Sequence, residues 1–340
     1  SMGYPLLAAN GRLVAWPDED KNVHLHDAVS GKRLRTMRCP NHAQYFPTLL
    51  FSPNSEFLIV DWSPLPVRLF QVSVGQDISP SHANPEQTLK TGWLSCMVCS
   101  PDSRLLAVSE AHSGKVRLLE IASGKLRAEF VGHRHGVRGL SFAPDGKTLA
   151  SGGEDNIAYL WDVSGARTPA AANKNSDLSS LWNDLASEDG RRAGVAIASL
   201  LRKPEASAAF LQERLHPVEA IDNKRLAQLI ADLDAAAFET REAASRELTR
   251  LGERVEAALR RELTNRPSLE MRRRIEDVLS KLEPYPPPPR TLRALRAIEV
   301  LEYIGTPAAR RCLEALAEGA TDARPTRDAQ AALRRLTKKR

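Results

Sequence analysis

The sequence predicts a multidomain β + α chain, in which a series of antiparallel β-sheets is followed by a helical region. Two patterns lead to this prediction. A strand-and-turn motif recurs every 42–49 residues up to residue 165, and from residue 178 the apolar residues change from alternating to helical spacing. Composition changes at the same place. Residues 1–165 hold 13 of the 18 aromatic residues and 16 residues of each charge, whereas residues 166–340 hold 32 Lys and Arg against 26 Asp and Glu.

Each predicted β repeat contains a strand that ends in a turn. The prolines of the turn are 48 and 43 residues apart, and Asn10-Gly11 begins a similar pattern near the N-terminus. Pro followed by Asn or Asp favours a chain reversal, and a short apolar run follows each turn. The three full motifs are Phe51-Ser52-Pro53-Asn54, Cys99-Ser100-Pro101-Asp102 and Phe142-Ala143-Pro144-Asp145-Gly146.

A second run in each repeat alternates between apolar and polar residues, which predicts another strand. Its fourth residue falls at positions 26, 70, 119 and 161, so the spacings are 44, 49 and 42 residues. The four runs are residues 23–27, 67–71, 116–120 and 158–162. The sequence therefore predicts three full repeats and a first repeat that begins inside its first strand.

The last repeat resembles the WD40 propeller family. Gly132-His133 opens it, Trp161-Asp162 closes it, and Ser151 and Asp155 occupy the family's other two polar positions. The resemblance implies a buried hydrogen-bonded tetrad of His133, Ser151, Asp155 and Trp161, because buried polar groups need partners. His42 to Phe70 has the same 28-residue spacing as His133 to Trp161. The earlier repeats depart from the family pattern. In the third repeat Lys90 replaces the His and Leu119-Glu120 replaces the Trp-Asp pair, and in the second repeat Pro64 falls where the Asp is expected.

About four repeats make an incomplete WD40-type β-propeller, since the family usually closes with seven blades. We therefore expect residues 3–165 to be the C-terminal part of a longer propeller, or to have their open edge covered. An uncovered sheet edge is a template for aggregation. Self-association of two half-propellers through the open edge is the alternative.

Residues 178–340 are predicted to form an α-helical HEAT-like solenoid, joined to the blades by a linker at 166–177. A pattern at Arg241, Ala244 and Leu248 returns 31 residues later. Gly252 and Gly305 are expected to end helices, and Thr306-Pro307 to begin one. The Pro-rich segment 284–289 is predicted to be an extended spacer, with a ligand for a proline-recognising domain as the alternative. The combination resembles bacterial WD40-repeat proteins, some of which carry kinase or other signalling domains.

Candidate chemical sites have simpler structural explanations. Cys96 and Cys99 have the spacing of redox or zinc sites, but residues three apart on a strand point to opposite faces. His24 and His26 share a strand face, where packing is favoured over metal binding. Cys39 and His42 could join the cysteines in a zinc site, but the repeat already accounts for His42. His133, Ser151 and Asp155 superficially offer a catalytic triad that the repeat assigns to structure. We predict no metal, no cofactor and no enzymatic activity.

Clustered arginines support the main alternative function. On a concave helical face, Arg272, Arg273 and Arg274 could contact nucleic-acid phosphates. Interleaved glutamates instead favour a solvated face with paired charges, and the pairs Glu242/Arg246 and Glu270/Arg274 fit that spacing. No aromatic residues lie among these arginines to stack on bases, so nucleic acid is the less favoured partner.

The preferred function is a non-enzymatic scaffold or target-recognition module in a larger signalling protein. Its candidate protein-binding residues precede the first strands of successive repeats, and Trp, Tyr and Arg are frequent interface anchors. They are Tyr45, Phe46, Trp93, Arg134 and His135. No apolar run of the sequence is long enough for a membrane helix, and nothing at the N-terminus resembles a signal peptide, so we expect a cytoplasmic protein.

Overall fold

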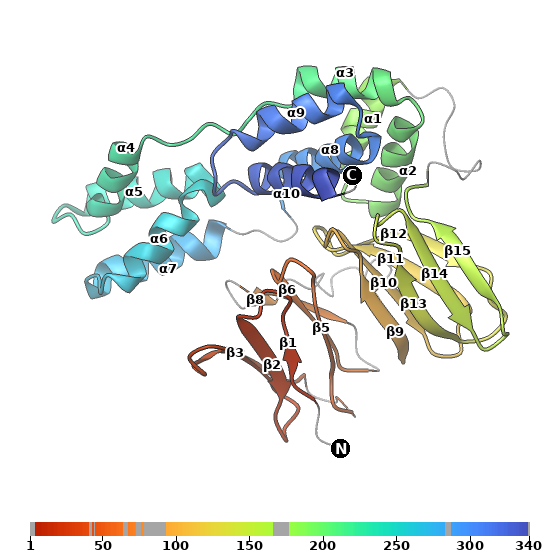
Figure 1. Ribbon diagram of the computed structural model, residues 1–340. Coiled ribbons are helices and arrows are strands. Elements are labelled where there is room, and N and C mark those ends of the chain that lie inside the picture. Colours follow the sequence, from red (N-terminus) through yellow and green to blue (C-terminus); the bar gives the residue numbers. More distant parts are fainter. Residues whose placement is uncertain are drawn as a thin grey trace. The chain divides into compact units, whose positions relative to one another are not determined.

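The computed structural model describes residues 4–40, 43, 45–63, 67–72, 76–77, 93–165, 177–282 and 287–338. Four antiparallel sheets are followed by a helical region, as the sequence predicts (Figure 1). Contacts divide the chain into two compact units. Ser187–Ala198 groups with the sheets, and Ser199–Arg340 with Asn175–Ala186 forms the helical unit.

The sheets, called blades 1 to 4, are up-and-down meanders of consecutive strands. Blade 1 contains β1 (Leu6–Leu7), β2 (Leu13–Pro17), β3 (Val23–Asp27) and β4 (Arg33–Met37). Blade 2 contains β5 (Thr48–Phe51), β6 (Phe57–Asp61), β7 (Arg68–Gln71) and β8 (Gln76–Asp77). Blade 3 contains β9 (Leu94–Cys99), β10 (Leu105–Glu110), β11 (Lys115–Glu120) and β12 (Lys125–Val131). Blade 4 contains β13 (Val137–Phe142), β14 (Thr148–Gly153) and β15 (Ala158–Asp162).

Blade 1 therefore has four strands, the first only two residues long, where the sequence predicts a truncated repeat. Among the described residues, blade 4 has three strands. Successive blades pack through apolar faces. Leu25 lies in one cluster with Leu58 and Val60, and Leu118 lies in another with Leu149.

The repeated turn has the same geometry in all four blades. The residue after its Asn or Asp has a positive φ of 61–70°, which Gly adopts without strain. The preceding Asn or Asp accepts a hydrogen bond from the backbone two residues later, and this local bond favours the turn. The positive-φ residues are Gly11, Ser55, Ser103 and Gly146.

The two serines at these positions also connect blades. Ser55 Oγ accepts from Asn10 N at 3.3 Å, and Ser103 Oγ accepts from Asn54 N at 3.0 Å. A non-glycine residue with positive φ is strained. Serine at this position has a structural role, because its side chain accepts a hydrogen bond from the neighbouring blade.

The ten described α-helices are amphipathic or buried segments that follow the sheets. They are α1 (Leu178–Asp184), α2 (Gly190–Leu201), α3 (Pro204–Arg214), α4 (Asn223–Asp232), α5 (Phe238–Leu251), α6 (Glu256–Thr264), α7 (Leu269–Leu282), α8 (Pro289–Ile304), α9 (Pro307–Ala317) and α10 (Arg324–Lys338), with a 3₁₀ turn at Gly252–Val255. The first part of α2 packs on blade 3. A Cβ at Gly190 would lie only 2.7 Å from Leu126 O.

The predicted helix boundaries are confirmed where capping residues define them. Gly252 and Gly305 follow α5 and α8 with positive φ, and the Thr306 side chain accepts from Ala309 N at the start of α9. The predicted spacer is wrong at its last residue, because Pro289 is the first residue of α8, where its fixed φ fits a helix. Residues 166–176 of the linker and 284–286 of the Pro-rich segment lie outside the described residues.

Candidate protein-interaction surface

One end of the blades carries the start of each first strand and the turn between each second and third strand; we call it the loop face. At this face the turn of one blade contacts the start of the next. Lys21 Nζ donates to Ala43 O at 2.7 Å, and Leu94 N donates to Ser63 Oγ at 3.2 Å. A Cβ on Gly114 would lie 1.8 Å from His133 O, so only glycine fits this third joint.

Two aromatic residues from neighbouring blades meet on the loop face. Tyr45 precedes β5 and Trp93 precedes β9, and their ring centroids lie 4.7 Å apart with an interplanar angle of 63°. The side chains remain 53% and 45% exposed. Phe46, the third aromatic residue predicted to bind protein, follows Tyr45 in the sequence and is half-buried. The structure thus joins Tyr45 to Trp93, which are 48 positions apart in the sequence.

A buried carboxyl group lies at the same joint. Asp61 ends the fully buried strand β6, and Ser63 Oγ donates to its carboxylate at 2.8 Å while accepting from Leu94 N. Burial raises the pKa of Asp61 to about 6, although the hydrogen bonds from Ser63 oppose this shift. Sequence reasoning missed Asp61; the signal was a single acidic residue directly after the apolar run 57–60.

The four residues expected to form a tetrad lie within hydrogen-bonding distance. Trp161 Nε1 donates to Ser151 Oγ at 2.8 Å, and Ser151 Oγ lies 2.8 Å from His133 Nε2. His133 Nδ1 lies 3.0 Å from Asp155 Oδ1. Hydrogen bonds from the backbone of Arg134 and from His133 lower the pKa of Asp155 to about 2. Ser151 and His133 are buried, and Trp161 Nε1 already donates to the serine hydroxyl, so this hydroxyl is not placed to attack a substrate.

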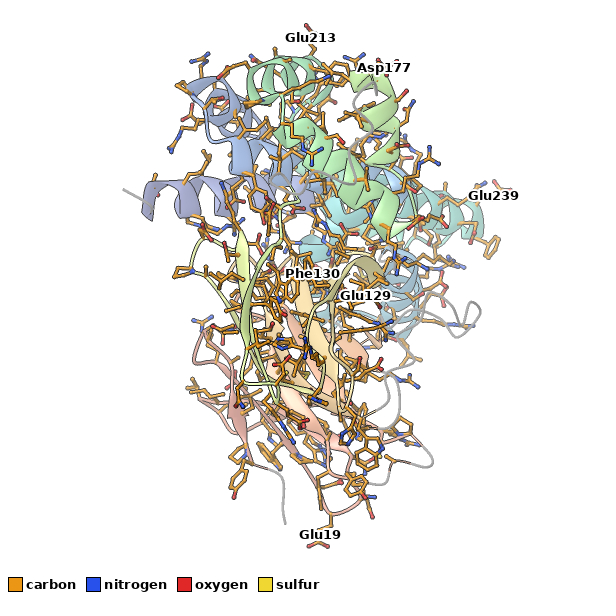
Figure 2. The ribbon with its side chains drawn as sticks, turned by 90° about the vertical axis from the view of Figure 1, so that its right-hand side faces the viewer. Glu19, Glu129, Phe130, Asp177, Glu213 and Glu239 are labelled. Atoms are coloured by element: carbon orange, nitrogen blue, oxygen red, sulfur yellow. The ribbon has the colours of Figure 1, made fainter. Side chains whose placement is uncertain are left out.

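Glycines and aromatic rings enclose these four residues. A Cβ at Gly132 would lie 2.7 Å from the Trp161 ring, and one at Gly153 would lie 2.3 Å from His133 Nδ1. Trp161 also stacks on Phe130 of β12, with centroids 5.2 Å apart (Phe130 is labelled in Figure 2). The Gly-His and Trp-Asp pairs of the sequence thus come together across blades 3 and 4.

The remaining predicted surface residues lie in blade 4. Arg134 and His135 are exposed on the loop just before β13. Among the described residues, no ring or ionic contact joins them to Tyr45 or Trp93. The candidate surface therefore has two parts, the aromatic pair of blades 2 and 3 and the polar loop of blade 4.

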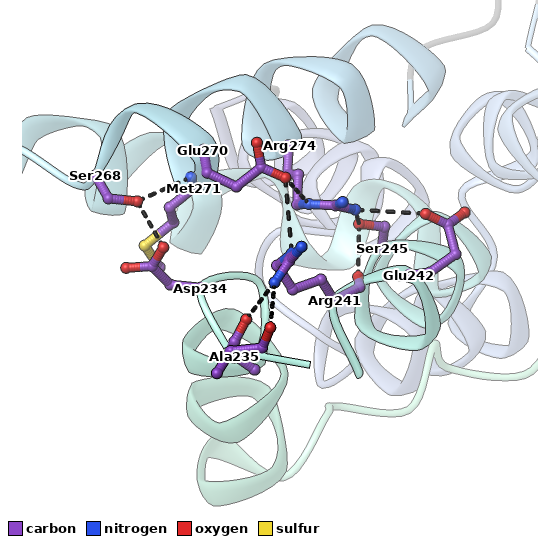
Figure 3. A network of polar contacts seen from close by, with 10 residues as sticks. Asp234, Ala235, Arg241, Glu242, Ser245, Ser268, Glu270, Met271 and Arg274 are labelled. Carbon is purple, nitrogen blue, oxygen red and sulfur yellow. Dashed lines mark hydrogen bonds and ion pairs between the residues drawn. The ribbon is translucent and has the colours of Figure 1, made fainter. Parts of the chain in front are cut away.

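Only two of the three clustered arginines of the helical unit are exposed enough to contact phosphates. Arg274 Nε lies 2.7 Å from Glu270 Oε1, and its Nη1 lies 3.4 Å from Glu242 Oε2 (Figure 3). Glu242 therefore contacts the neighbouring helix, where the sequence predicts Arg246 as its partner. Arg272 and Arg273 are exposed, and the described residues include no ion-pair partner for either.

The residues considered for metal binding are engaged in packing and hydrogen bonds. His26 stacks on Trp16 with centroids 4.0 Å apart, and His24 Nε2 lies 2.8 Å from Asp18 Oδ2. Burial raises the pKa of Cys99 to about 12, which disfavours the reactive thiolate. Within the described ranges no three His, Cys, Asp or Glu residues form a metal-binding group. His42, Lys90 and Pro64 lie outside the described residues.

Comparison with known proteins identifies one segment of the blade unit. Residues 124–162 match the family described as WD domain, G-beta repeat. This WD repeat begins at the outermost strand of blade 3 and ends with β15, so it includes all four tetrad residues. The expected WD40 resemblance of the last repeat is confirmed.

Curated relatives are similar over short stretches. The small ribosomal subunit protein RACK1 of Neurospora crassa is 32% identical over 92 residues, which is 27% of this chain and 29% of that protein. MST50-interacting protein 11 of Pyricularia oryzae is 31% identical over 90 residues, covering 26% and 28%. Nuclear distribution protein PAC1 of Arthroderma benhamiae is 27% identical over 173 residues, covering 46% and 37%.

The chain thus spans about a third of the length of these relatives. They are fungal proteins, so they give no support to the bacterial setting that the sequence resemblance suggested. Among solved structures, the computationally designed Ika4 protein aligns with 44% of this chain and 85% of its own at a TM-score of 0.35 and 18% identity, too slight a likeness to bear on function. No described helix is both long and apolar enough to cross a membrane.

Proposed function

We propose that the chain is a non-enzymatic protein–protein interaction scaffold in a larger cytoplasmic signalling protein, and that its loop face binds a protein or peptide. The Tyr45–Trp93 pair carries this proposal. Both rings are about half exposed, yet Trp93 is adjacent in sequence to Leu94, whose backbone N–H donates a hydrogen bond to Ser63 Oγ and so fixes the joint. Rigid, partly exposed Tyr and Trp side chains supply large contact area at low entropic cost.

The chemistry of the blade unit supports a binding role over catalysis. Ser151, the residue that would act as the nucleophile of a triad, is buried and its hydroxyl accepts a hydrogen bond from Trp161 Nε1. We propose that these four residues act as a structural tetrad that fixes the loop preceding β13. Arg134 and His135 on that loop would then add polar contacts to the same ligand.

We further propose that the helical unit is built from HEAT-like repeats. Helices α5 and α7 each have 14 residues and begin 31 positions apart. Both contribute to one core that contains Leu248, Ile275 and Val278. Paired amphipathic helices at this interval are typical of stacked α-solenoids, which also present extended surfaces.

A displayed random-peptide library selected on the full chain tests the binding proposal. Selected peptides should lose at least tenfold in affinity for a Tyr45→Ala/Trp93→Ala double variant, because the two rings supply the buried anchors. Tyr4→Ala is the matched control, since Tyr4 is 88% exposed and should not affect binding. Peptides that bind the wild-type chain and the Tyr45→Ala/Trp93→Ala variant with equal affinity would contradict the proposed surface, as would a selection that yields no binder.

Nucleic-acid binding is the alternative function, and it has a test of its own. Arg272 and Arg273 are the exposed members of the predicted basic cluster. Binding of a nucleic-acid duplex that weakens steeply with salt and disappears in an Arg272→Gln/Arg273→Gln variant would favour this alternative.

A further inference from the structure

The four blades have an uncovered sheet face at each end of their series. Blade 1 packs on blade 2, and blade 3 on blade 4, through shared apolar clusters. Asn54 of blade 2 is hydrogen-bonded to Ser103 of blade 3. Each blade therefore uses one face toward the blade before it and the other face toward the blade after it. Blade 4 has no following blade and blade 1 no preceding one among the described residues.

A leucine repeated in every blade is buried at the joints between blades and exposed on the last face. It is the third residue of each alternating run, 23–27, 67–71, 116–120 and 158–162, and Leu25 and Leu118 lie in the apolar clusters that join their blades to the following ones. Leu25, Leu69 and Leu118 are 1%, 4% and 0% exposed. The equivalent Leu160 of blade 4 is 77% exposed. The sequence thus places at the end of the series the same apolar residue that is buried at each internal joint.

The opposite face of blade 1 shows the complementary feature. Leu7 pairs in register with Val14, as Phe51 pairs with Leu58 and Cys99 with Leu106. Phe51 and Cys99 are each 7% exposed, whereas Leu7 is 60% exposed. The first blade therefore exposes an apolar residue at the position that is buried in blades 2 and 3, and in blade 2 this residue, Phe51, packs with residues of the preceding blade.

The two faces are the two halves of one repeated joint. The last face of one molecule should fit the first face of another as Leu118 of blade 3 fits blade 4. If two molecules pair in this way at both ends, every blade face is covered and the ring closes with two-fold symmetry. Eight blades lie within the range of known propellers.

We propose that two copies of this chain associate head to tail through these faces, with Leu160 of one copy packed beside Leu7 of the other. The occupant of each exposed face is thus a second copy of the same chain. The proposal goes beyond ligand binding at the loop face and does not depend on it. A charged residue at either leucine should prevent dimerisation, because it would lie unpaired in an apolar joint.

Sedimentation equilibrium of the full chain at micromolar concentration provides the test. The wild-type chain should have twice the mass of one chain, whereas Leu160→Glu and Leu7→Lys should each sediment at the mass of one chain. Both leucines are exposed within a single chain, so each variant should keep the wild-type circular dichroism and melting temperature of its blades. Val29→Glu is the control, since Val29 is 85% exposed in a turn and should leave the dimer intact.

Mixing the two variants distinguishes head-to-tail pairing from other dimers. A mixture of Leu160→Glu and Leu7→Lys chains has one joint with opposite charges and one wild-type joint, so it should recover the doubled mass. Three results would overturn the proposal: a wild-type chain that stays monomeric at tens of micromolar, a dimer unaffected by Leu160→Glu, or a mixture that remains monomeric. Species larger than a dimer would also contradict a closed ring.

Discussion

Replacing Ser151 by Ala should destabilise the blade unit by about 2–4 kcal/mol. Ser151 Oγ accepts from Trp161 Nε1 and contacts His133 Nε2, both at 2.8 Å. The His133 side chain is fully buried and Trp161 is half-buried, so water replaces the lost hydroxyl poorly. A buried polar group left without a partner costs about 1–3 kcal/mol, and two groups are affected here.

Urea unfolding followed by tryptophan fluorescence is the appropriate assay. Four of the five tryptophans lie in the blades, so the signal reports mainly on that unit. With a urea slope of about 2–3 kcal/mol/M, a loss of 3 kcal/mol lowers the midpoint by about 1–1.5 M. Ser141→Ala, an exposed serine in the adjacent strand, is the matched control and should change the midpoint little.

A double-mutant cycle isolates the hydrogen bond itself. Trp161→Phe removes the indole donor but retains an aromatic ring against Phe130. The double variant should be more stable than the sum of the single effects predicts by about 1 kcal/mol, because neither partner is left alone. The reasoning is refuted if Ser151→Ala costs under about 0.5 kcal/mol, or if the two single effects simply add.

Three further predictions concern one joint between blades and two aspartates with shifted pKa values. Gly114→Ala should lower the stability of the blades by about 3 kcal/mol or more in a thermal melt, because its Cβ would overlap His133 O; Gly139→Ala, with open space around it, is the control. Asp61→Asn should stabilise the blades by about 1–3 kcal/mol at pH 7 and by nothing near pH 4, because the pKa raised to about 6 means that ionisation opposes folding as pH rises from about 4 to 6. A urea midpoint for Asp61→Asn equal to the wild-type value at both pH values would contradict this. The pKa of Asp155, lowered to about 2, predicts the opposite trend below pH 4: wild-type stability should fall as pH drops toward 2, and Asp155→Asn should flatten that decline in urea midpoints between pH 4 and 2.

Repeat spacing predicted the features that depend on position within one blade. Strands and turns recur at intervals of 42–49 residues, and the last repeat holds all four residues of the expected tetrad, so a single sequence was enough to align them. The helix ends at Gly252 and Gly305 were predictable for a similar reason, because capping is decided by neighbouring residues.

Features that depend on how blades or helices meet were not predictable. Tyr45 and Trp93 contact each other only because two joints bring their loops together, and no spacing rule signals this. The approach of Glu242 to Arg274 arises from packing between helices, whereas the sequence argument considered pairs within one helix. The positive φ of Ser103 was unexpected, since glycine is the usual choice and the hydrogen bond that the hydroxyl accepts comes from another blade.

The direction of the serine links has a consequence for synthesis on the ribosome. Asn10 donates forward to Ser55, and Asn54 donates forward to Ser103. The turn of each of these blades therefore lacks one partner until about 45–49 further residues have emerged. Because chains are made from the N-terminus, the first two blades would mature in order, each completed by the arrival of its successor.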